Sequence, residues 1–251
     1  MLIKSRVLED ITSKRYTIKF AKTEEEVNAA LKLRYEVFKK ELNRGFDFDK
    51  NRDKDEYDDQ AHHLIVVDNE SDRVIGTYRM QTYEQAFEGN GFVSNNRFHL
   101  DQFPDDVLKS AVEVGRACIH KDHRNGRVLF LLWKGFAGYL TNFNKRYLFG
   151  YSAFETGDPV VLWNTYHHLL ENNQIHPEYD IEVRDEYKLP ERKKNGTTDE
   201  IEIPPLLKNY LDVGCYVCGK PSLDDNRLAH ALILLDVETI SDRTRKLFFG
   251  K

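Results

Sequence analysis

The segment from Lys121 to Arg127 combines basic residues with a glycine at a place where phosphate chemistry is expected. Residues 111–120 (AVEVGRACIH) are predicted to form a strand, and residues 128–142 are predicted to form a helix. The first turn of a helix presents unpaired backbone N–H groups and a positive dipole end, which suits a phosphate. The predicted phosphate ligands are Lys121, Arg124, Asn125, Gly126 and Arg127. A solvent-exposed basic turn is the alternative interpretation.

Two ionisable residues of the same predicted strand, Glu113 and Arg116, lie three positions apart. In a regular strand their side chains point to opposite faces of the sheet. A bulge near Gly115 would bring them to the same face. A glutamate in such a place is a candidate general base that acts through water, and an ion pair with Arg116 is the alternative. The two roles are compatible.

An arginine is also predicted in an unusual place on the first helix. Thr23 and Glu26 form a capping box that predicts the start of this helix. Its apolar face contains Val27, Ala30, Leu31, Arg34 and Phe38 at helical spacing. Arg34 therefore lies on the apolar stripe and needs a partner, because an unpaired buried charge is costly. The alternative is a side chain that extends to solvent.

The remaining elements alternate between strands and helices. Residues 43–62 are charged and predicted to be a largely solvated loop. Further strands are predicted at 15–20, 63–67, 73–81, 147–154, 215–220 and 231–237. Further helices are predicted from Asp158-Pro159 to about residue 172, at 206–214 and at 240–249. This order of elements predicts an α/β protein.

The composition excludes several classes of protein. The chain has 251 residues, a net charge of -5 and 40% hydrophobic residues, which is ordinary globular composition. The acidic balance argues against a nucleic-acid partner. The apolar stretch around 128–140 is too short for a membrane span, which needs about 20 residues, so a cytoplasmic protein is expected. Three cysteines, two of them in a CxxC, predict reduced thiols and no metal site.

Five motifs together resemble a known family. They are Leu33-Arg-Tyr-Glu-Val-Phe38, Asp55-Glu-Tyr-Asp58, His63-Leu64, Gly76-Thr-Tyr-Arg79 and Glu113-Val-Gly-Arg116. In their order and spacing they are similar to the branch of the GNAT superfamily that contains acyl-ACP-dependent ornithine N-acyltransferases, N-acyl amino acid synthases and, more distantly, acyl-homoserine-lactone synthases. The resemblance implies a GNAT fold with a mixed central sheet flanked by helices. It implies an N-acyltransferase core over 1–175 and an α/β C-terminal extension over 176–251.

The C-terminal half favours the lipid-synthesising members of that branch. Leu131-Leu-Trp133, Gly150-Tyr-Ser152 and Pro204-Pro-Leu-Leu-Lys208 resemble segments of those members, and homoserine-lactone synthases lack a C-terminal segment of the last type. The loop at 124–127 is a shortened form of the general GNAT pyrophosphate loop. The resemblance therefore implies the phosphopantetheine thioester of acyl carrier protein, rather than free coenzyme A, as the donor substrate, with no other cofactor.

The resemblance also implies roles for individual residues. Glu113 and Arg116 are expected to be catalytic. The acceptor side is expected to contain Arg34, Phe38, Asp55, Asp58, Arg79 and Arg116. In this interpretation the aspartates hold an amino group and an arginine holds a carboxylate. A carboxylate–guanidinium network that only orders the acidic loop is the alternative.

The predicted function is transfer of a 3-hydroxy fatty acyl group from acyl carrier protein to the α-amine of an amino acid. Ornithine is the expected acceptor, and glycine is the main rival. Homoserine-lactone synthesis is a competing enzymatic hypothesis, and a non-catalytic, haemolysin-like membrane protein is a competing hypothesis of another class. The basic C-terminal segment around Arg243–Phe249 predicts either peripheral contact with the inner membrane or packing on the domain.

Overall fold

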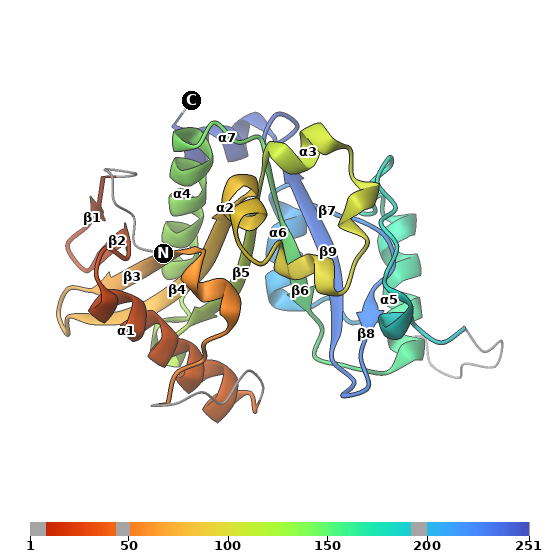
Figure 1. Cartoon of the computed structure of the whole chain (residues 1–251), viewed down its shortest axis with the longest axis horizontal. Coiled ribbons are helices and arrows are strands. Elements are labelled where there is room, and N and C mark those ends of the chain that lie inside the picture. The colour runs from red at the N-terminus through yellow and green to blue at the C-terminus, as the bar shows by residue number, and fades with distance from the viewer. Residues whose placement is uncertain (1–8, 44–50, 192–199, 251) are drawn as a thin grey trace. The chain divides into compact units, whose positions relative to one another are not determined.

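A computed structural model describes residues 9–43, 51–191 and 200–250, and the chain divides into two compact units (Figure 1). The first unit contains Met1–Gly91, Val112–Lys145 and Lys246–Lys251. The second unit contains Phe92–Ala111 and Arg146–Arg245. The expected division after residue 175 into a core and an extension stays a prediction.

The first unit is built on antiparallel strands that pair in the order of the sequence. These strands are β1 (Ile11–Thr12), β2 (Tyr16–Phe20), β3 (His62–Asp68), β4 (Arg73–Thr82) and β5 (Ala111–Ile119). The predicted strands at 15–20, 63–67, 73–81 and 111–120 are therefore confirmed. The register of β4 against β5 shifts between Thr77 and Arg79, since Thr77 faces Cys118 while Arg79 faces Gly115. This is the predicted bulge.

Helical segments connect these strands. They are α1 (Glu24–Arg34), a π-helical continuation η1 (Tyr35–Glu41), the 3₁₀ turns η2 (Glu56–Asp59) and η5 (Lys121–His123), α2 (Tyr83–Glu88) and α4 (Arg127–Asn142). The predicted capping box starts α1, because the Thr23 side chain accepts from the Glu26 backbone and the Glu26 side chain accepts from the Thr23 backbone. The loop predicted over 43–62 is partly outside the described residues, which omit 44–50. In its described part, the turn at 53–59, which we name the acidic turn, buries Asp53, Asp55 and Asp58, whereas Glu56 and Asp59 are exposed.

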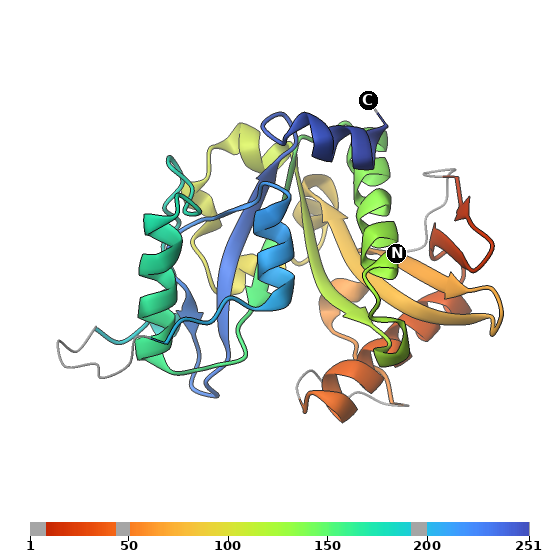
Figure 2. The same cartoon turned by 180° about the vertical axis from the view of Figure 1, so that it is seen from behind.

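The helices α1 and α4 lie on opposite faces of the sheet of the first unit (Figures 1 and 2). Ile65 packs with Ala30 of α1. A Cβ on Gly135 of α4 would lie 2.6 Å from Leu64, so Leu64 faces α4. Successive residues of a strand point to opposite faces, so burial on both sides explains the apolar residues 64–67 in β3.

Replacement of Gly135 by alanine is expected to destabilise the protein by about 1–3 kcal/mol, the usual cost of overpacking. The new methyl group would meet Leu64 at 2.6 Å and Ile18 at 3.0 Å, and both side chains are buried. Equilibrium urea denaturation measures this loss. Gly115→Ala is a matched control, because no atom lies within 4 Å of the position of its Cβ. Equal effects of the two substitutions would contradict this packing.

The second unit is centred on β9 (Ala229–Asp236), which pairs antiparallel with β6 (Tyr147–Ala153), β7 (Tyr216–Val217) and β8 (Ser222–Leu223). Its helical segments are η3 (Val93–Asn96), η4 (Leu100–Gln102), α3 (Asp105–Lys109), α5 (Pro159–Glu171), η6 (Asp185–Tyr187) and α6 (Pro205–Asp212). The helix predicted at Pro159 is confirmed with Asp158 as its cap. Cys215 and Cys218 are free and buried.

The last helix, α7 (Asp242–Phe249), carries residues of both units. The Phe248 ring lies 5.5 Å from Phe130 and 5.6 Å from Trp133 of α4, so this aromatic side chain packs on the protein. Leu247 is exposed. Contact of the basic segment with a membrane stays a prediction. Within the described residues, no helix combines the length and apolar character that crossing a bilayer demands.

Candidate active site

Arg34 finds the partners that its place on the apolar stripe requires. Its side chain is 1% exposed. Nε and Nη2 donate to Asp53 Oδ1 at 3.0 and 2.7 Å, and Nη1 donates to Asp58 Oδ1 at 2.6 Å. The alternative of a side chain that reaches solvent is therefore wrong, because two buried carboxylates neutralise the guanidinium from within.

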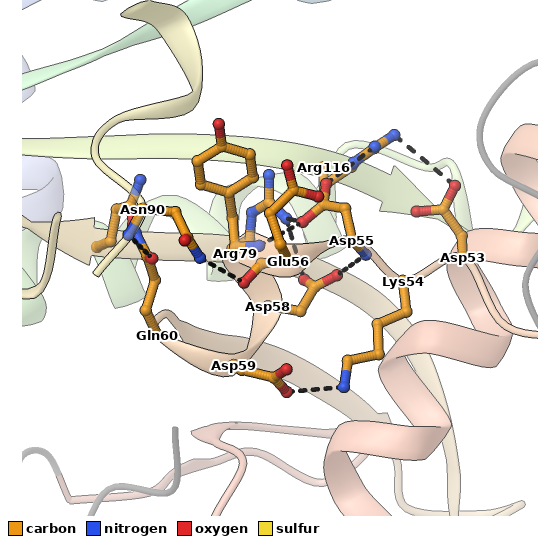
Figure 3. A network of polar contacts seen from close by, with 12 residues as sticks. Asp53, Lys54, Asp55, Glu56, Asp58, Asp59, Gln60, Arg79, Asn90 and Arg116 are labelled. Carbon is orange, nitrogen blue, oxygen red and sulfur yellow. Dashed lines mark hydrogen bonds and ion pairs between the residues drawn. The ribbon is translucent and has the colours of Figure 1, made fainter.

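A second capping box fixes the conformation of the acidic turn. Asp55 is the cap of η2, and its Oδ1 accepts from the Tyr57 N–H at 3.0 Å. Asp58 three residues later accepts from the Asp55 N–H at 2.8 Å. Both carboxylates also accept from Nη1 of Arg79 on β4, as Figure 3 shows. The spacing D-x-x-D thus folds the turn and presents its acids to the sheet.

The bulge in β5 directs Arg116 toward the same turn. Arg116 has a φ of +53°, in the left-handed region that a regular strand residue avoids. Its Nη2 lies 3.2 Å from Asp55 Oδ2, and its Nη1 lies 3.7 Å from Asp53 Oδ2. Its guanidinium carbon lies 5.8 Å from the centre of the Phe38 ring, a cation–π contact. Arg116, the residue with the left-handed φ, therefore connects β5 to Asp53 and Asp55.

Three arginines and three aspartates therefore form one neutral group, which we name the arginine–aspartate cluster. Its members are Arg34, Asp53, Asp55, Asp58, Arg79 and Arg116. All have side chains at most 6% exposed except Arg116, which is 20% exposed. The carboxylate–guanidinium network expected as an alternative thus exists, and Arg116 is its member nearest to solvent. Binding of an acceptor by these residues stays a prediction.

The cluster shifts the pKa values of its members. Burial opposes ionisation of Asp58, but the charges of Arg34 and Arg79 outweigh it and hold the pKa of Asp58 well below its usual value. Burial also works to lower the pKa of Arg79, but Asp58, Asp55 and Glu113 raise it. Both groups are therefore charged at neutral pH, and the cluster is a fixed ionic scaffold.

Two adjacent histidines beside the cluster are buried as neutral rings. Burial lowers the pKa of His62 and of His63 to about 4. His62 Nδ1 lies 2.8 Å from the Tyr139 hydroxyl, and His63 Nε2 lies 3.3 Å from the Asp58 carbonyl. His63 therefore supports the acidic turn rather than carrying charge.

These histidines predict that the protein begins to lose stability at pH values well above those at which carboxylates take up protons. In the unfolded chain a histidine binds its proton near pH 6.5, whereas His62 and His63 resist protonation to about pH 4. The unfolded state thus binds more protons below pH 6.5, so the free energy of unfolding falls as pH is lowered from 6.5 toward 4.

Urea unfolding at pH 7 and pH 5 measures this fall. His63→Gln keeps a donor near the Asp58 carbonyl and is expected to reduce the difference between the two pH values by about 1–2 kcal/mol. His168→Gln, at a partly exposed position of α5, is the control and is expected to leave the difference unchanged. An unchanged difference in His63→Gln would contradict the assignment.

Glu113 lies on β5 directly opposite Gln81 of β4. Its side chain is 4% exposed, and its Oε2 accepts from Gln81 Nε2 at 2.5 Å. The predicted candidate base is thus in the first unit, on the strand that also carries Arg116. The carboxylate lies near the charge of Arg79 and accepts from an amide donor, which holds it in place.

The predicted phosphate loop has its own internal contacts. Arg124 donates to Glu41 through both terminal nitrogens, at 2.5 and 2.8 Å, and to the Ile119 carbonyl through Nε at 2.9 Å. Asn125 Oδ1 accepts from the Arg127 N–H, and Gly126 has a φ of +76°. Arg124 and Asn125 therefore shape the loop, whereas Lys121 and Arg127 are exposed cations at its two ends.

The sequence interpretation missed Asp53 and Gln81. Asp53 has a fully buried side chain and bonds to Arg34, yet it stands in a run of charges that predicts solvent. The spacing D-x-D-x-x-D was an available signal. Gln81 carries no such signal, because it is a single glutamine in a strand of mixed composition.

The chain is similar to several known proteins. Residues 33–134 match the model of the acetyltransferase (GNAT) domain, a range that contains Arg34, Arg79, Glu113 and Arg116. An L-ornithine N(alpha)-acyltransferase of Rhodobacter capsulatus is 27% identical in an alignment of 248 positions that covers 93% of this chain and 94% of that protein. One of the same name from Brucella abortus is 26% identical over 90% of this chain and 86% of that protein.

Solved structures show the same fold. The CoA-dependent acyl-homoserine lactone synthase BjaI, solved with SAM and isopentyl-CoA, superposes with a TM-score of 0.54 at 14% identity, covering 90% of this chain and 82% of that chain. The homoserine-lactone synthase LasI gives 0.51 at 11% identity, covering 95% and 96%. The protein is therefore an acyltransferase with a GNAT acetyltransferase domain over residues 33–134, and nearly its whole length is similar to proteins named L-ornithine N(alpha)-acyltransferases.

Proposed function

We propose that the protein transfers a fatty acyl group from a thioester to the α-amine of ornithine. The observation that carries this proposal is the similarity, over nine-tenths of the chain, to proteins named L-ornithine N(alpha)-acyltransferases. The buried Glu113 and the bulge beside it supply groups that suit the reaction.

The reaction needs a base and a donor for the oxyanion. The neutral amine attacks the thioester carbonyl carbon, a C–N bond forms, and the C–S bond breaks to release a thiol. In our proposal Glu113 takes the amine proton through a water, and the proton passes on to the leaving thiolate. Backbone N–H groups of β5 near the bulge stabilise the oxyanion, because a bulge leaves ladder groups available for a ligand.

The acceptor would lie beside the exposed part of the arginine–aspartate cluster. Arg116 is its most exposed cation, at 20%, and a guanidinium binds a carboxylate through two parallel bonds. Asp55, which shares that guanidinium, is the nearest anion for an amino group. Arg34 and Asp58 are more deeply buried, so in our proposal they support the site without contacting the acceptor.

We propose acyl carrier protein as the donor, with its phosphopantetheine as the only prosthetic group used. Lys121 and Arg127 are exposed cations at the ends of the loop that precedes α4. A carrier protein with acidic helices would be attracted to such a loop, and its single phosphate needs fewer backbone donors than a pyrophosphate.

Reversal of these two charges, Lys121→Glu with Arg127→Glu, is expected to raise KM for acyl-ACP about tenfold or more while kcat changes little. The reason is that exposed charges at a docking surface act mainly on association. Initial rates at several ACP concentrations and at two salt concentrations measure the effect. Lys32→Glu with Lys40→Glu on the helix α1–η1 is the matched control. A KM shift of equal size in that control would rule out a docking role.

The function itself is tested by incubating the protein with 3-hydroxyacyl-ACP and an equimolar pool of amino acids, followed by mass spectrometry. We expect N-acylornithine as the main product. An N-acylglycine product without N-acylornithine would overturn the acceptor but keep the reaction class. A product only with acyl-CoA would overturn the donor, and an acyl-homoserine lactone made from S-adenosylmethionine would overturn the proposal.

A further inference from the structure

A chain of side-chain amides connects the turn after α2 to the carboxylate of Glu113. The backbone N–H of Asn90 donates to Gln60 Oε1 at 2.6 Å, as Figure 3 shows. Gln60 Nε2 then donates to Gln81 Oε1 at 2.6 Å, and Gln81 Nε2 donates to Glu113 Oε2 at 2.5 Å. The path thus runs from a backbone donor, through two glutamines, to the candidate base.

The direction of this path is fixed by backbone groups, which cannot exchange donor and acceptor roles. The Asn90 N–H can only donate, so it requires the oxygen of Gln60. The Gly91 carbonyl can only accept, and it receives Gln60 Nε2 at 2.9 Å and Gln81 Nε2 at 3.4 Å. If the amide of Gln81 were reversed, its oxygen would face both the Gly91 carbonyl and the Glu113 carboxylate. The amide orientations are therefore determined by the network itself.

Burial and further contacts hold the side chains of Gln60 and Gln81 in place. Gln81 is 2% exposed, and it is paired with Glu113 in the register of β4 against β5. The backbone carbonyl of Gln60 accepts from Gln85 Nε2 at 3.0 Å, which holds Gln60 from a second side. A Cβ on Gly89 would lie 2.2 Å from Gln60 Oε1, so only glycine leaves room for the Gln60 amide. Buried amide networks that are fully bonded specify one arrangement.

We propose that Gln60 and Gln81 are positioning residues that deliver a fixed hydrogen-bond donor from the Gly89–Gly91 turn to the Glu113 carboxylate. The inference rests on the proposed function, in which Glu113 takes the amine proton. A donor that can only donate favours the charged form of the carboxylate and holds it in one orientation. Arg79 is a charged group close to Glu113, but its guanidinium is engaged by Asp55 and Asp58. Gln81 is a neutral donor to the Glu113 carboxylate and lies in the same surroundings as the charge of Arg79.

Two substitutions test the relay at opposite ends. Gln81→Met keeps the length of the side chain but removes both amide groups. Gly89→Ala leaves both glutamines in the sequence and displaces the Gln60 amide sterically. For both, we expect kcat to fall about tenfold, KM for donor and acceptor to stay within about twofold, and the acid limb of the kcat/KM profile to move up by about one pH unit. Glu88→Ala, at an exposed neighbour of Gly89, is the matched control and should match the wild type.

Glu113→Gln, measured in parallel, separates the hypothesis that Glu113 is the base from the hypothesis that Gln60 and Gln81 position it. If Glu113→Gln is inactive while folded Gln81→Met and Gly89→Ala keep the wild-type kcat and pH profile, the relay is wrong and the proposed base stands. If Glu113→Gln keeps full activity, the base is wrong. If Gln81→Met does not fold, Gly89→Ala and Gln60→Met at the half-buried end of the path decide by the same pH profile. A uniform fall in activity without a shift of the acid limb would also overturn the relay.

Discussion

Glutamine in place of Glu113 is expected to leave the protein folded and to lower kcat about 100-fold to 10,000-fold, the usual contribution of a general base. The substitution is nearly isosteric, and the new amide oxygen can still accept from Gln81 Nε2, as Glu113 Oε2 does at 2.5 Å. Only the capacity to take a proton is lost. Steady-state product formation measures the fall in kcat, and thermal unfolding measures whether the variant stays folded.

The matched control is Glu88→Gln, which makes the same chemical change at an exposed position of α2. It should keep the wild-type rate. Free hydroxylamine in place of the amino acid gives a further check, because its neutral nitrogen needs little help from a base. Its reaction should therefore be much less impaired in Glu113→Gln than that of an amino acid. Equal impairment would indicate a fault in donor binding or in folding.

Asparagine in place of Asp58 is expected to lower the free energy of unfolding by about 3–5 kcal/mol and to abolish activity. Asp58 is 2% exposed and accepts from Arg34 at 2.6 and 3.1 Å and from Arg79 at 3.1 Å. Removal of its charge leaves buried guanidinium groups undercompensated, which costs far more than the loss of a surface ion pair. Equilibrium denaturation at pH 7 measures the loss.

The neighbouring Asp59→Asn is an unusually close control. Asp59 pairs with Lys54 at 2.7 Å, but its side chain is 75% exposed, so its substitution should change stability little. The two variants have the same composition and differ only in the place of one charge. Similar unfolding free energies in both would contradict a buried scaffold made of arginine and aspartate.

The elements of the first unit could be read from local patterns. The hairpin of β3 and β4, the capping box at Thr23 and the helix after the basic loop all follow from periodicity and turn chemistry. The requirement that Arg34 have a partner also followed from its helical position. A bulge near Gly115 was considered from the sequence as the way to bring Glu113 and Arg116 to one face, and the structure has a register shift there.

The partners of these charges could not be read in the same way. The charged run at 51–62 predicts solvent, yet Asp53, Asp55 and Asp58 are buried, because each meets a guanidinium brought by α1, β4 or β5. A carboxylate can be buried only when another residue supplies the hydrogen bonds and charge that water gave it. Here that residue is distant in sequence, so the local pattern does not reveal the burial. The pairing of Arg124 with Glu41 is a further case.

The sequence by itself determined which residue types were available for acyl transfer and the order of strands and helices that carries them. Only the tertiary structure decided which acids neutralise which arginines, and that the amide of Gln81 directs its nitrogen to Glu113. The physical reason is that hydrogen-bond direction and charge compensation depend on groups that β-sheet pairing brings together. Neighbours in sequence cannot specify them.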